Sequence, residues 1–460
     1  MLTELLNPEN KIAILWFWKE GQSSLKFLLK QRREDITVLD DDIWKESIFK
    51  EFQKHHSKLK WVFWWPYLDT LWEYDIIIKT PGISPFWEKL RAYKHKFISQ
   101  TQIFFEKYIG KVIWITGTKG KSTISTLLFM SMKDLWYSVK LVGNIGNPVL
   151  DEVDILSWES YDYIIYELSS YMLQDFNPKL DIWILNNIYP CHLDWHYDSF
   201  NIYKEAKLNI LKDARIKIVN AELATDREVQ ELSWERYYFW DKWNVYIESD
   251  WVNIDWKKII WEQDMLLKWV HNYYNIAAVL QALLCVWKNQ ESIVNSFQKT
   301  LKNFHGLPHR LQSIWVYEGI EFIDDAIATT PESTIAAIAA LDGKLQTLFL
   351  WGQDSGFVFQ NLRKKIISSS IETIVAFPDT SETIFPEIRY RSYDVPFEMM
   401  IEWKNILFLK TRSMKIAVWF SFRNSLPGKI ALLSSAAPSF SLWKNYVAKA
   451  EDFIKEVHSF

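Results

Sequence analysis

Residues 112–123 of this 460-residue chain read Val-Ile-Trp-Ile-Thr-Gly-Thr-Lys-Gly-Lys-Ser-Thr, an apolar run followed by a loop of glycine, lysine and hydroxyl residues. The run predicts a buried strand, and Ile124–Met130 predicts a helix directly after the loop. Backbone N–H groups and the helix N-terminus bind phosphate at such a junction. Lys121 would reach the terminal phosphates of a nucleotide, and Ser122 would face Mg²⁺. The stretch predicts a nucleotide-binding α/β domain.

Strands alternate with helices on both sides of this loop, which predicts α/β architecture. The expected strands are Ile12–Leu15, Thr37–Leu39, Asp75–Ile78, Tyr163–Tyr166, Asp181–Leu185, Ile320–Ile323, Thr347–Leu350, Thr373–Ala376, Ile416–Val418 and Ile430–Leu433. Residues 235–262 predict small hairpins. A chain of this length is too long for one core, and we expect three domains. They are a Rossmann-like domain over 1–108, a central P-loop ATPase-type domain over 109–306, and a Rossmann-like domain over 307–460.

The bulk composition limits the class of protein. The net charge of −4 does not favour nucleic acid or a membrane surface as the main partner. The two cysteines, Cys191 and Cys285, offer no disulfide framework. No run of 18 apolar residues and no signal peptide is recognisable. We expect a cytoplasmic protein that does not insert into a membrane.

Tryptophan stands at many positions where glycine is expected. The chain has 26 Trp and 13 Gly, and glycine at about 3% is far below the roughly 7% that is usual. With glycine at Trp16 and Trp18, the first strand and Gly21 would form a complete G-x-G-x-x-G. Some bacterial lineages read UGA as glycine, and our hypothesis is that such codons are printed here as tryptophan. The alternative is a genuinely tryptophan-rich protein. We expect Trp16, Trp18, Trp114 and Trp351 to lie at tight loops or turns with few packed partners.

The first loop taken by itself indicates a dinucleotide-binding fold. Asp40 ends the second expected strand about twenty residues after the loop, as the acidic residue of NAD-binding folds does. An oxidoreductase is therefore the default interpretation of this segment in isolation.

A series of motifs changes that interpretation, because together they resemble the Mur ligases of the MurD type. Besides Thr116–Thr123, the motifs are Leu141-Val-Gly-Asn144-Ile-Gly146, Glu167-Leu-Ser-Ser-Tyr171, His192-Leu-Asp-Trp-His196, Ala206-Lys207, His271-Asn-Tyr-Tyr-Asn275, Gly306-Leu-Pro-His-Arg310 and Leu432-Leu-Ser-Ser-Ala436. They occur in family order along almost the whole chain. Trp195 is interpreted as a true tryptophan.

The resemblance implies an ATP site and a magnesium site. The residues matching ATP contacts are Thr116, Gly117, Thr118, Lys119, Gly120, Lys121, Ser122, Thr123, Asn272, Asn275, Arg310 and Asp325. Those matching the metal site are Ser122, Glu167, His192 and Lys207, the last of which is carbamylated in similar enzymes. Lys121, Lys207, His192 and Glu167 are the expected catalytic residues. Without the resemblance, Lys207 would be interpreted as a surface lysine on a helix over 202–211.

The resemblance also implies the substrate residues. Trp16, Trp18, Gly21 and Asp40 match the uridine diphosphate loop, and Asn144 and Ser169 match residues near the muropeptide carboxylate. Thr329, Ser439 and Tyr446 match glutamate contacts. Ile327 stands where many relatives have a lysine, and Tyr446 where they have phenylalanine, so D- and L-glutamate both remain possible substrates.

The implied activity is ATP-dependent addition of glutamate to UDP-N-acetylmuramoyl-L-alanine through an acyl phosphate, in peptidoglycan synthesis and therefore in cell shape and division. The implied cofactors are ATP and Mg²⁺, and a monomer is expected. The alternatives are another ligase of the superfamily, such as a folylpolyglutamate synthase, which lacks the leading domain, and a non-catalytic nucleotide-binding protein.

Overall fold

A computed structural model describes most of the chain, and its contacts divide the chain into two compact units, Met1–Phe304 and His305–Phe460. The residues it describes are 1–42, 45–63, 66–84, 86–144, 147–156, 161–173, 180–190, 195–197, 199–209, 214–231, 235–239, 245–248, 251–255, 257–261, 270–287, 289–352, 358–437 and 442–460. Within them the strands form three sheets, and the protein is an α/β protein of the three-domain type expected from the sequence.

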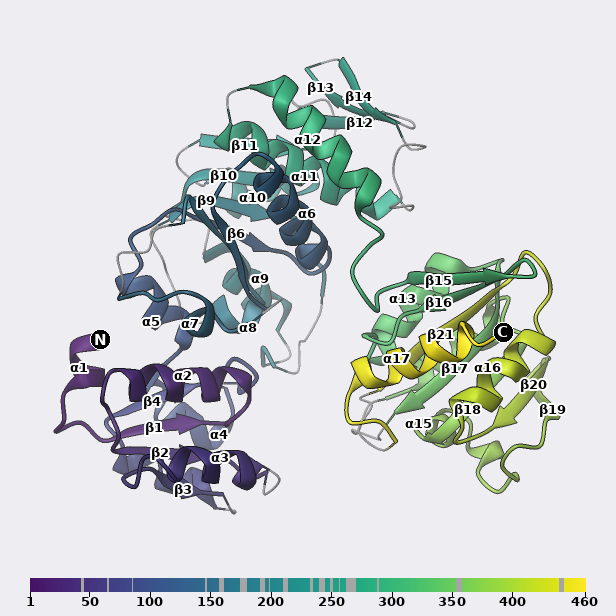
Figure 1. Cartoon of the computed structure of the whole chain (residues 1–460), viewed down its shortest axis with the longest axis horizontal. Coiled ribbons are helices and arrows are strands. Elements are labelled where there is room, and N and C mark those ends of the chain that lie inside the picture. The colour runs from purple at the N-terminus through teal and green to yellow at the C-terminus, as the bar shows by residue number, and fades with distance from the viewer. Residues whose placement is uncertain are drawn as a thin grey trace. The chain divides into compact units, whose positions relative to one another are not determined.

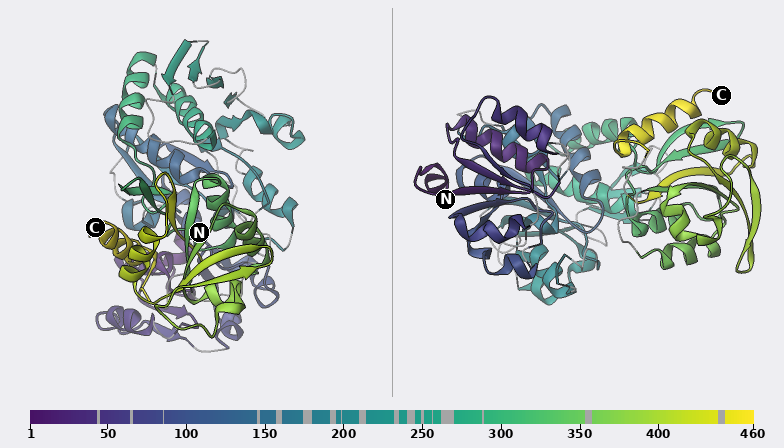
Figure 2. Two further views of the ribbon diagram at one scale, coloured as in Figure 1. Left: turned by 90° about the vertical axis from the view of Figure 1, so that its right-hand side faces the viewer. Right: turned by 90° about the horizontal axis from the view of Figure 1, so that it is seen from below.

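The first sheet is entirely parallel, in the order β3-β2-β1-β4-β5. Its strands are β1 (Ile12–Leu15), β2 (Ile36–Leu39), β3 (Lys60–Val62), β4 (Ile76–Lys79) and β5 (Phe97–Ile98). The helices around it are α1 (Leu2–Leu6), α2 (Lys19–Lys30), α3 (Glu46–Gln53), η2 (Tyr67–Glu73), α4 (Glu88–Arg91), η3 (Lys94–Lys96) and α5 (Gln100–Lys107). Figure 2 shows helices on both sides of the purple strands. Apolar side chains fill both faces, which explains the unbroken apolar runs of β1 and β4.

The second sheet has nine strands in the order β14-β13-β12-β11-β10-β9-β6-β8-β7. The strands are β6 (Val112–Thr116), β7 (Val139–Gly143), β8 (Tyr163–Glu167), β9 (Leu180–Leu185), β10 (Ala214–Asn220), β11 (Glu235–Phe239), β12 (Val245–Glu248), β13 (Trp251–Ile254) and β14 (Lys257–Trp261). The last three pair antiparallel, as expected for the hairpins over 235–262, whereas β11 pairs parallel with its neighbours. Strand β6 pairs parallel with β8 and β9, and its loop therefore lies at the carboxyl edge of the parallel part of the sheet.

Helices α6 (Lys121–Asp134), α11 (Val270–Val286) and α12 (Gln290–Asn303) pack together beside this sheet, as Figure 1 shows. The remaining helices of the unit are α7 (Val149–Glu152), α8 (Ser170–Leu173), α9 (Phe200–Asn209), η4 (Ala221–Leu223) and α10 (Arg227–Gln230). Helix α6 starts directly after the phosphate loop, and α11 supplies the asparagines of the His271–Asn275 motif.

The third sheet, in the order β15-β16-β21-β17-β18-β20-β19, has a parallel core with antiparallel edge strands. Its strands are β15 (Gln312–Tyr317), β16 (Ile320–Asp324), β17 (Leu345–Gly352), β18 (Thr373–Asp379), β19 (Phe397–Ile401), β20 (Lys404–Lys410) and β21 (Ile430–Ala436). The helices are α13 (Pro331–Leu341), α14 (Gln360–Ser368), α15 (Thr380–Ile384), η6 (Pro386–Ile388), α16 (Met414–Arg423) and α17 (Tyr446–Val457). One apolar core lies under α13, α14 and α15, and another lies under α16 and α17.

One strand expected from the sequence is wrong. Ile416–Val418 lies inside helix α16, whose N-cap Ser413 accepts a hydrogen bond from the Ile416 N–H. Met414, Ala417, Val418 and Ser421 are buried at helical spacing along one face. A three-residue apolar run could not separate strand from helix, and the cap was the stronger signal.

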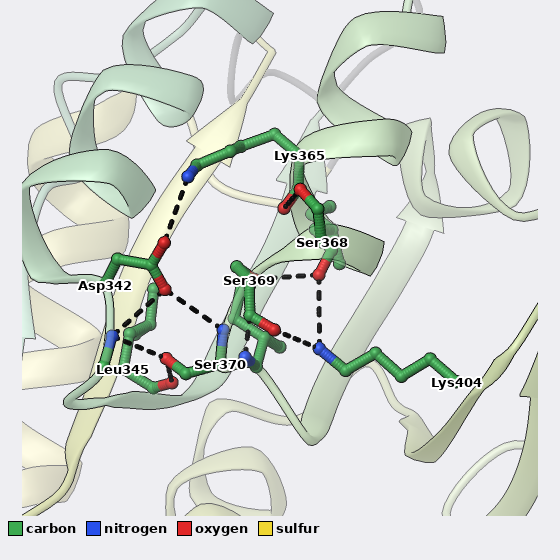
Figure 3. Close-up of polar contacts among 10 residues, drawn as sticks. Asp342, Leu345, Lys365, Ser368, Ser369, Ser370 and Lys404 are labelled. Atoms are coloured by element: carbon green, nitrogen blue, oxygen red, sulfur yellow. Dashed lines mark hydrogen bonds and ion pairs between the residues drawn. The ribbon is translucent and has the colours of Figure 1, made fainter.

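A polar network joins the turns at the amino ends of three strands of the third sheet (Figure 3). Asp342, after α13, accepts hydrogen bonds from Lys365 (3.1 Å) and from the Ser370 N–H (3.1 Å). Lys404, at the start of β20, donates to the carbonyl oxygen of Ser369 (2.5 Å), just beyond the C-terminus of α14. Because the network lies at the amino ends of β17, β18 and β20, it stabilises the edge opposite to the candidate site residues.

Candidate active site

The loop between β6 and α6 requires glycine at its last position. Gly120 is the N-cap of α6 and has a φ of +82°. A Cβ atom there would lie 2.1 Å from Oδ1 of Asn275 and 2.5 Å from Nδ2 of Asn186. Asn186 Nδ2 donates to the carbonyl oxygen of Lys119 and to Asn275 Oδ1, both at 3.0 Å, and Asn275 donates to Asn272 Oδ1 at 3.1 Å. The three asparagines therefore hold the loop against α11.

The side chain of Lys121 folds back over the loop. Its Nζ donates to the carbonyl oxygens of Gly117 (3.0 Å) and Thr118 (3.3 Å). The Thr118 hydroxyl lies 2.7 Å from the hydroxyl of Tyr203, on α9. Ser122 follows in the first turn of α6 and is half-buried. The loop therefore presents a lysine, a hydroxyl group and a helix N-terminus together, which suits a nucleotide phosphate.

Lys207, on α9, lies directly beneath this loop. Its side chain is 1% exposed, so the interpretation as a surface lysine is wrong. Its Nζ donates to the Gly117 carbonyl oxygen (3.0 Å) and to Thr116 Oγ1 (3.3 Å), and it lies 5.0 Å from the centre of the Tyr203 ring. The fold thus brings two lysines predicted from the sequence, Lys121 and Lys207, to one carbonyl oxygen.

Glu167 ends strand β8 with its side chain completely buried. Oε1 accepts a 2.7 Å hydrogen bond from the side-chain amide of Asn144, and Oε2 accepts a longer one, 3.4 Å, from Ser125 on α6. Ser169 caps the next turn by accepting the Met172 N–H at 3.4 Å. Two motifs predicted from the sequence, those of Asn144 and Glu167, therefore meet at one carboxylate.

The oxygen atoms around Glu167 suit a hard cation. Carboxylate and hydroxyl oxygens are ligands that Mg²⁺ prefers. Glu167 supplies a carboxylate whose Oε2 lies 3.4 Å from the hydroxyl of Ser125, and Thr116 and Ser122 supply hydroxyl groups at the two ends of the phosphate loop. Among the described residues, no group of three His, Cys, Asp or Glu side chains is arranged to hold a metal ion. His192, the fourth residue of the expected metal site, lies outside the described residues.

The loop after β1 has the backbone that a glycine-rich loop requires. Trp16 has a φ of +70°, where a tryptophan is strained. Its indole N–H donates to the hydroxyl of Tyr67 (3.1 Å), and its ring lies 3.4 Å from where a Cβ atom would stand at Gly82. A Cβ atom at Gly21 would lie 2.2 Å from the Trp16 carbonyl oxygen. Gly21 thus permits the close approach of α2 to β1 that this loop type needs.

Asp40 holds this loop from behind. Its buried carboxylate accepts the Phe17 N–H (2.6 Å) and the ammonium of Lys45 (2.8 Å). Lys45 Nζ also lies 4.0 Å from the centre of the Trp18 ring, which is half exposed at the N-cap of α2. Burial raises the pKa of Glu20, in the first turn of α2, to about 7, and Lys79 opposes that shift. A neutral Glu20 would not repel a diphosphate at this helix end.

In the C-terminal unit, the expected nucleotide and glutamate residues lie near the carboxyl ends of β16 and β21. Asp325 accepts hydrogen bonds from Ser434 Oγ (2.9 Å) and from the Leu311 N–H (3.3 Å), and burial raises its pKa to about 7. His309 Nδ1 lies 2.7 Å from Asp324 Oδ2, and its ring is 6.0 Å from that of Tyr446. Thr329 and Ile327 are half-buried on the turn after β16, and Arg310 is exposed. Ser439 lies outside the described residues.

Sequence reasoning missed Lys449, a fully buried lysine on α17. Its Nζ contacts the hydroxyl of Ser435. Burial lowers the pKa of Lys449 to about 7, and the carboxylates of Asp324 and Asp325 oppose that shift. Its position on α17, three residues after Tyr446, was the only available signal. Tyr203 and Asn186 were missed as well, because only the fold brings them to the phosphate loop.

The tryptophans expected in loops divide into two groups. Trp16 and Trp18 lie in the first loop, but the expectation is wrong for Trp114 and Trp351, which lie inside β6 and β17 with completely buried indoles. The Trp114 ring stacks 5.2 Å from that of Trp183. Among the described residues, the buried indole N–H groups of these three tryptophans have no hydrogen-bond acceptor, which is unusual for a native tryptophan. The glycine hypothesis stays a prediction.

A further tryptophan at a glycine site emerged only from the structure. Trp136 follows the last turn of α6 with a φ of +67°, and its side chain is 95% exposed. The backbone N–H of Trp136 donates to the Lys133 carbonyl oxygen at 3.0 Å. The backbone N–H of Tyr137 donates to the Met132 carbonyl oxygen, also at 3.0 Å. This is the helix-ending arrangement in which glycine is the preferred residue.

Comparisons with known proteins find similar sequences along most of the chain. Residues 115–283 match the family model of the Mur ligase middle domain. The UDP-N-acetylmuramoylalanine–D-glutamate ligase of Clostridium tetani is 28% identical over 403 residues, covering 84% of this chain and 83% of that enzyme. The UDP-N-acetylmuramoyl-L-alanine–L-glutamate ligase of Xanthomonas oryzae pv. oryzae is 28% identical over 467 residues, which cover 97% of this chain and 94% of that enzyme.

Solved structures of Mur ligases share the fold of this chain at low identity. The UDP-N-acetylmuramate–alanine ligase of Thermotoga maritima matches with a TM-score of 0.56 at 15% identity, over 98% of this chain and 100% of that one. The MurF ligase of the same organism, solved with ADP, matches with a TM-score of 0.52 at 13% identity, over 99% and 97%. No helix among the described residues is long and apolar enough to span a membrane. The matched middle domain and the relatives agree with one another: the chain carries a Mur ligase middle domain and is similar over most of its length to UDP-N-acetylmuramoylalanine–glutamate ligases.

Proposed function

We propose that this protein is an ATP-dependent ligase that joins glutamate to UDP-N-acetylmuramoyl-L-alanine during peptidoglycan precursor synthesis. One observation carries the proposal more than any other. Lys121 and Lys207 both donate to the Gly117 carbonyl oxygen at 3.0 Å, in the loop whose glycines and helix N-terminus suit a phosphate. The relatives that bear the names of such ligases supply the substrate class.

The phosphate loop would bind ATP through its N–H groups, and Lys121 would exchange its two carbonyl partners for phosphate oxygens. Thr116, Thr118, Lys119 and Thr123 complete the loop, while Asn272 and Asn275 fix it from α11. Transfer of a phosphoryl group depends on positioning and on neutralising charge. No side chain has to act as a covalent nucleophile.

Glu167, Ser122, His192 and a carbamylated Lys207 are the residues that we assign to Mg²⁺. When bound, the metal neutralises charge on the transferring phosphoryl group. Asn144 orients Glu167 through its 2.7 Å hydrogen bond. A carbamate on Lys207 would turn a buried cation into an anion, which suits a metal site, and it forms from the neutral amine.

The reaction balances as two steps. A carboxylate oxygen of UDP-N-acetylmuramoyl-L-alanine attacks the γ-phosphorus of ATP, which releases ADP and gives an acyl phosphate. The amine of glutamate then attacks the acyl carbon, loses a proton and expels inorganic phosphate as the amide forms. Asn144 and Ser169 are the residues we assign to the reacting carboxylate.

The N-terminal domain, residues 1–108, would bind the uridine diphosphate through the loop of residues 16, 18 and 21, which Asp40 holds in place. The central domain, residues 109–306, would bind ATP. The C-terminal domain, residues 307–460, would supply Arg310 and Asp325 for the nucleotide and Thr329, Ser439 and Tyr446 for glutamate. We expect a monomer in the cytoplasm, which size-exclusion chromatography and cell fractionation would check.

The stereochemistry of glutamate stays open, because relatives of both kinds are 28% identical to this chain. We expect D-glutamate. The test is phosphate release by the purified protein with ATP and UDP-N-acetylmuramoyl-L-alanine, with D-glutamate or L-glutamate added in parallel. Release with D-glutamate alone supports the proposal, release with L-glutamate alone corrects the stereochemistry, and release with neither contradicts the proposal. Phosphate release with a folate substrate offered instead of the muropeptide would indicate the folylpolyglutamate synthase alternative.

A further inference from the structure

Trp195 links the domain of the second sheet to the domain of the first sheet, because it accepts one hydrogen bond from the loop after β4 and donates another to that loop. It lies in the segment between β9 and α9. The hydroxyl of Ser84, in the loop after β4, donates to the Trp195 carbonyl oxygen at 2.7 Å. The indole N–H of Trp195 donates to the Gly82 carbonyl oxygen at 3.3 Å. Ser84 and Trp195 are only 1% and 7% exposed, so water does not compete for these bonds. We call Gly82, Ser84 and Trp195 the Trp195 latch.

On its other side, Trp195 contacts the segment that follows Glu167. Its ring lies 4.6 Å from that of Tyr171, on α8. The next residue, His196, is fully buried, and its Nε2 lies 3.0 Å from Ser170 Oγ. Ser170 and Tyr171 are the third and fourth residues after Glu167, whose carboxylate is bonded to Asn144. A continuous series of contacts therefore runs from the loop after β4 to the carboxylate of Glu167.

The loop after β4 is itself held firmly. The buried ammonium of Lys79 donates to the carbonyl oxygens of Ile83 (2.8 Å) and Thr80 (3.4 Å). The same ammonium lies 5.6 Å from the centre of a Trp195 ring. Because the loop after β4 has its own internal hydrogen bonds, it is rigid, and the Trp195 latch can fix the distance between this loop and α8.

We propose that Trp195 is a positioning residue that fixes the separation between the uridine-diphosphate loop and Glu167, and thereby selects the acceptor by its length. The inference rests on the proposed function. One acceptor molecule must place its diphosphate at the first sheet and its carboxylate at Glu167. With the separation fixed, UDP-N-acetylmuramoyl-L-alanine fits, whereas UDP-N-acetylmuramate, which is one residue shorter, does not reach.

Two variants remove the two bonds separately. Trp195→Phe removes the indole donor and keeps an aromatic ring, and Ser84→Ala removes the hydroxyl donor. Ser84→Thr keeps a hydroxyl group and serves as the conservative rescue. Trp72→Phe changes a tryptophan of the first unit that is 66% exposed and serves as the matched control. For each protein, kcat and KM are measured with both acceptors, and KM is measured for ATP.

We expect selectivity, the ratio of kcat/KM for the two acceptors, to fall about five-fold in Trp195→Phe and in Ser84→Ala, the size of one lost buried hydrogen bond. The KM for ATP should stay unchanged. Ser84→Thr and Trp72→Phe should keep the selectivity of the original protein. A loss that is equal for both acceptors, or an unchanged ratio, overturns the inference.

Urea denaturation of each variant separates lost folding from lost positioning. If Trp195→Phe does not fold, Ser84→Ala decides the question, because deleting one hydroxyl group leaves the aromatic packing intact. If the unaltered protein ligates neither acceptor, the proposed function fails. If the protein is a ligase and its variants keep full selectivity, the inference about Trp195 fails and the proposed function stands.

Discussion

The buried ammonium of Lys207 donates a 3.0 Å hydrogen bond to the carbonyl oxygen of Gly117. This bond links α9 to the phosphate loop from beneath, while Lys121 donates to the same oxygen from the loop itself. Lys207 is only 1% exposed and lies this close to the phosphate loop, so it is positioned for a role in the active site as well as for packing.

Lys207→Ala should lower kcat by about 100-fold, as removal of one preorganised charged group in an active site does. Lys204→Ala, on the same helix but ion-paired to Asp226, is the control and should keep most of the activity. Wild-type protein in ¹³C-bicarbonate should show a carbamate resonance by NMR, and Lys207→Ala should show none. Turnover of Lys207→Ala at the original rate would exclude the metal role of this lysine.

Lys121→Ala should reduce kcat/KM for ATP by about 1,000-fold without unfolding the protein, since phosphoryl transfer relies on charge neutralisation. Steady-state kinetics and a urea titration measure the two effects. Lys133→Ala removes an exposed lysine from the last turn of the same helix and is the control. Near-normal kinetics in Lys121→Ala would mean that the loop does not bind ATP as proposed.

Asp325→Asn should become more stable relative to the unaltered protein as pH rises from 5.5 to 8. Burial raises the pKa of Asp325 from 3.8 to about 7, so the folded protein binds the proton more tightly than the unfolded chain. The stability that this group contributes is therefore present below about pH 4 and is lost as pH rises through 7. The asparagine side chain does not titrate in this range, so the stability of the variant lacks this dependence on pH.

Urea midpoints of both proteins at the two pH values measure this difference. Asp342→Asn is the control. Burial raises the pKa of Asp342, but hydrogen bonds from Lys365 and Ser370 outweigh it and lower the pKa, so Asp342 stays charged throughout the range. A pH-independent difference for Asp325→Asn would show that this carboxyl group is already ionised at pH 5.5.

Trp136→Gly should raise the free energy of unfolding by about 1 kcal/mol, because it relieves a positive φ and has almost no packing to lose at 95% exposure. Trp72→Gly should lower it, since Trp72 lies in the 3₁₀ helix η2 and glycine is unfavourable there. Codons at Trp16 and Trp136 test the underlying hypothesis. UGA at these positions agrees with glycine in the cell, and UGG would show true tryptophan.

Local signals were sufficient for most of the fold. Ile12–Leu15 was predicted with its observed bounds, and the loop with its flanking strand and helix followed from the pattern of residues 112–123. The strand Lys404–Lys410 was missed because lysines at both ends hide its apolar centre, although its parallel pairing with β18 explains why it forms.

The site was less predictable than the fold. Motifs located Glu167, Lys121 and Lys207, but the partners that orient them come from distant segments. Ser125 reaches Glu167 from the middle of a helix, and Tyr203 reaches Thr118 across 85 positions of sequence. Such contacts depend on tertiary packing, which no spacing along the chain encodes.

The most direct test of the account follows one oxygen atom. UDP-N-acetylmuramoyl-L-alanine labelled with ¹⁸O in its carboxylate is incubated with ATP, glutamate and the protein, and the released phosphate is analysed by mass spectrometry. Because the carboxylate oxygen attacks the γ-phosphorus and leaves with it, the account predicts one ¹⁸O atom in each phosphate, together with ADP and the amide product. Phosphate without the label, or release of AMP and diphosphate, would contradict a ligase that works through an acyl phosphate.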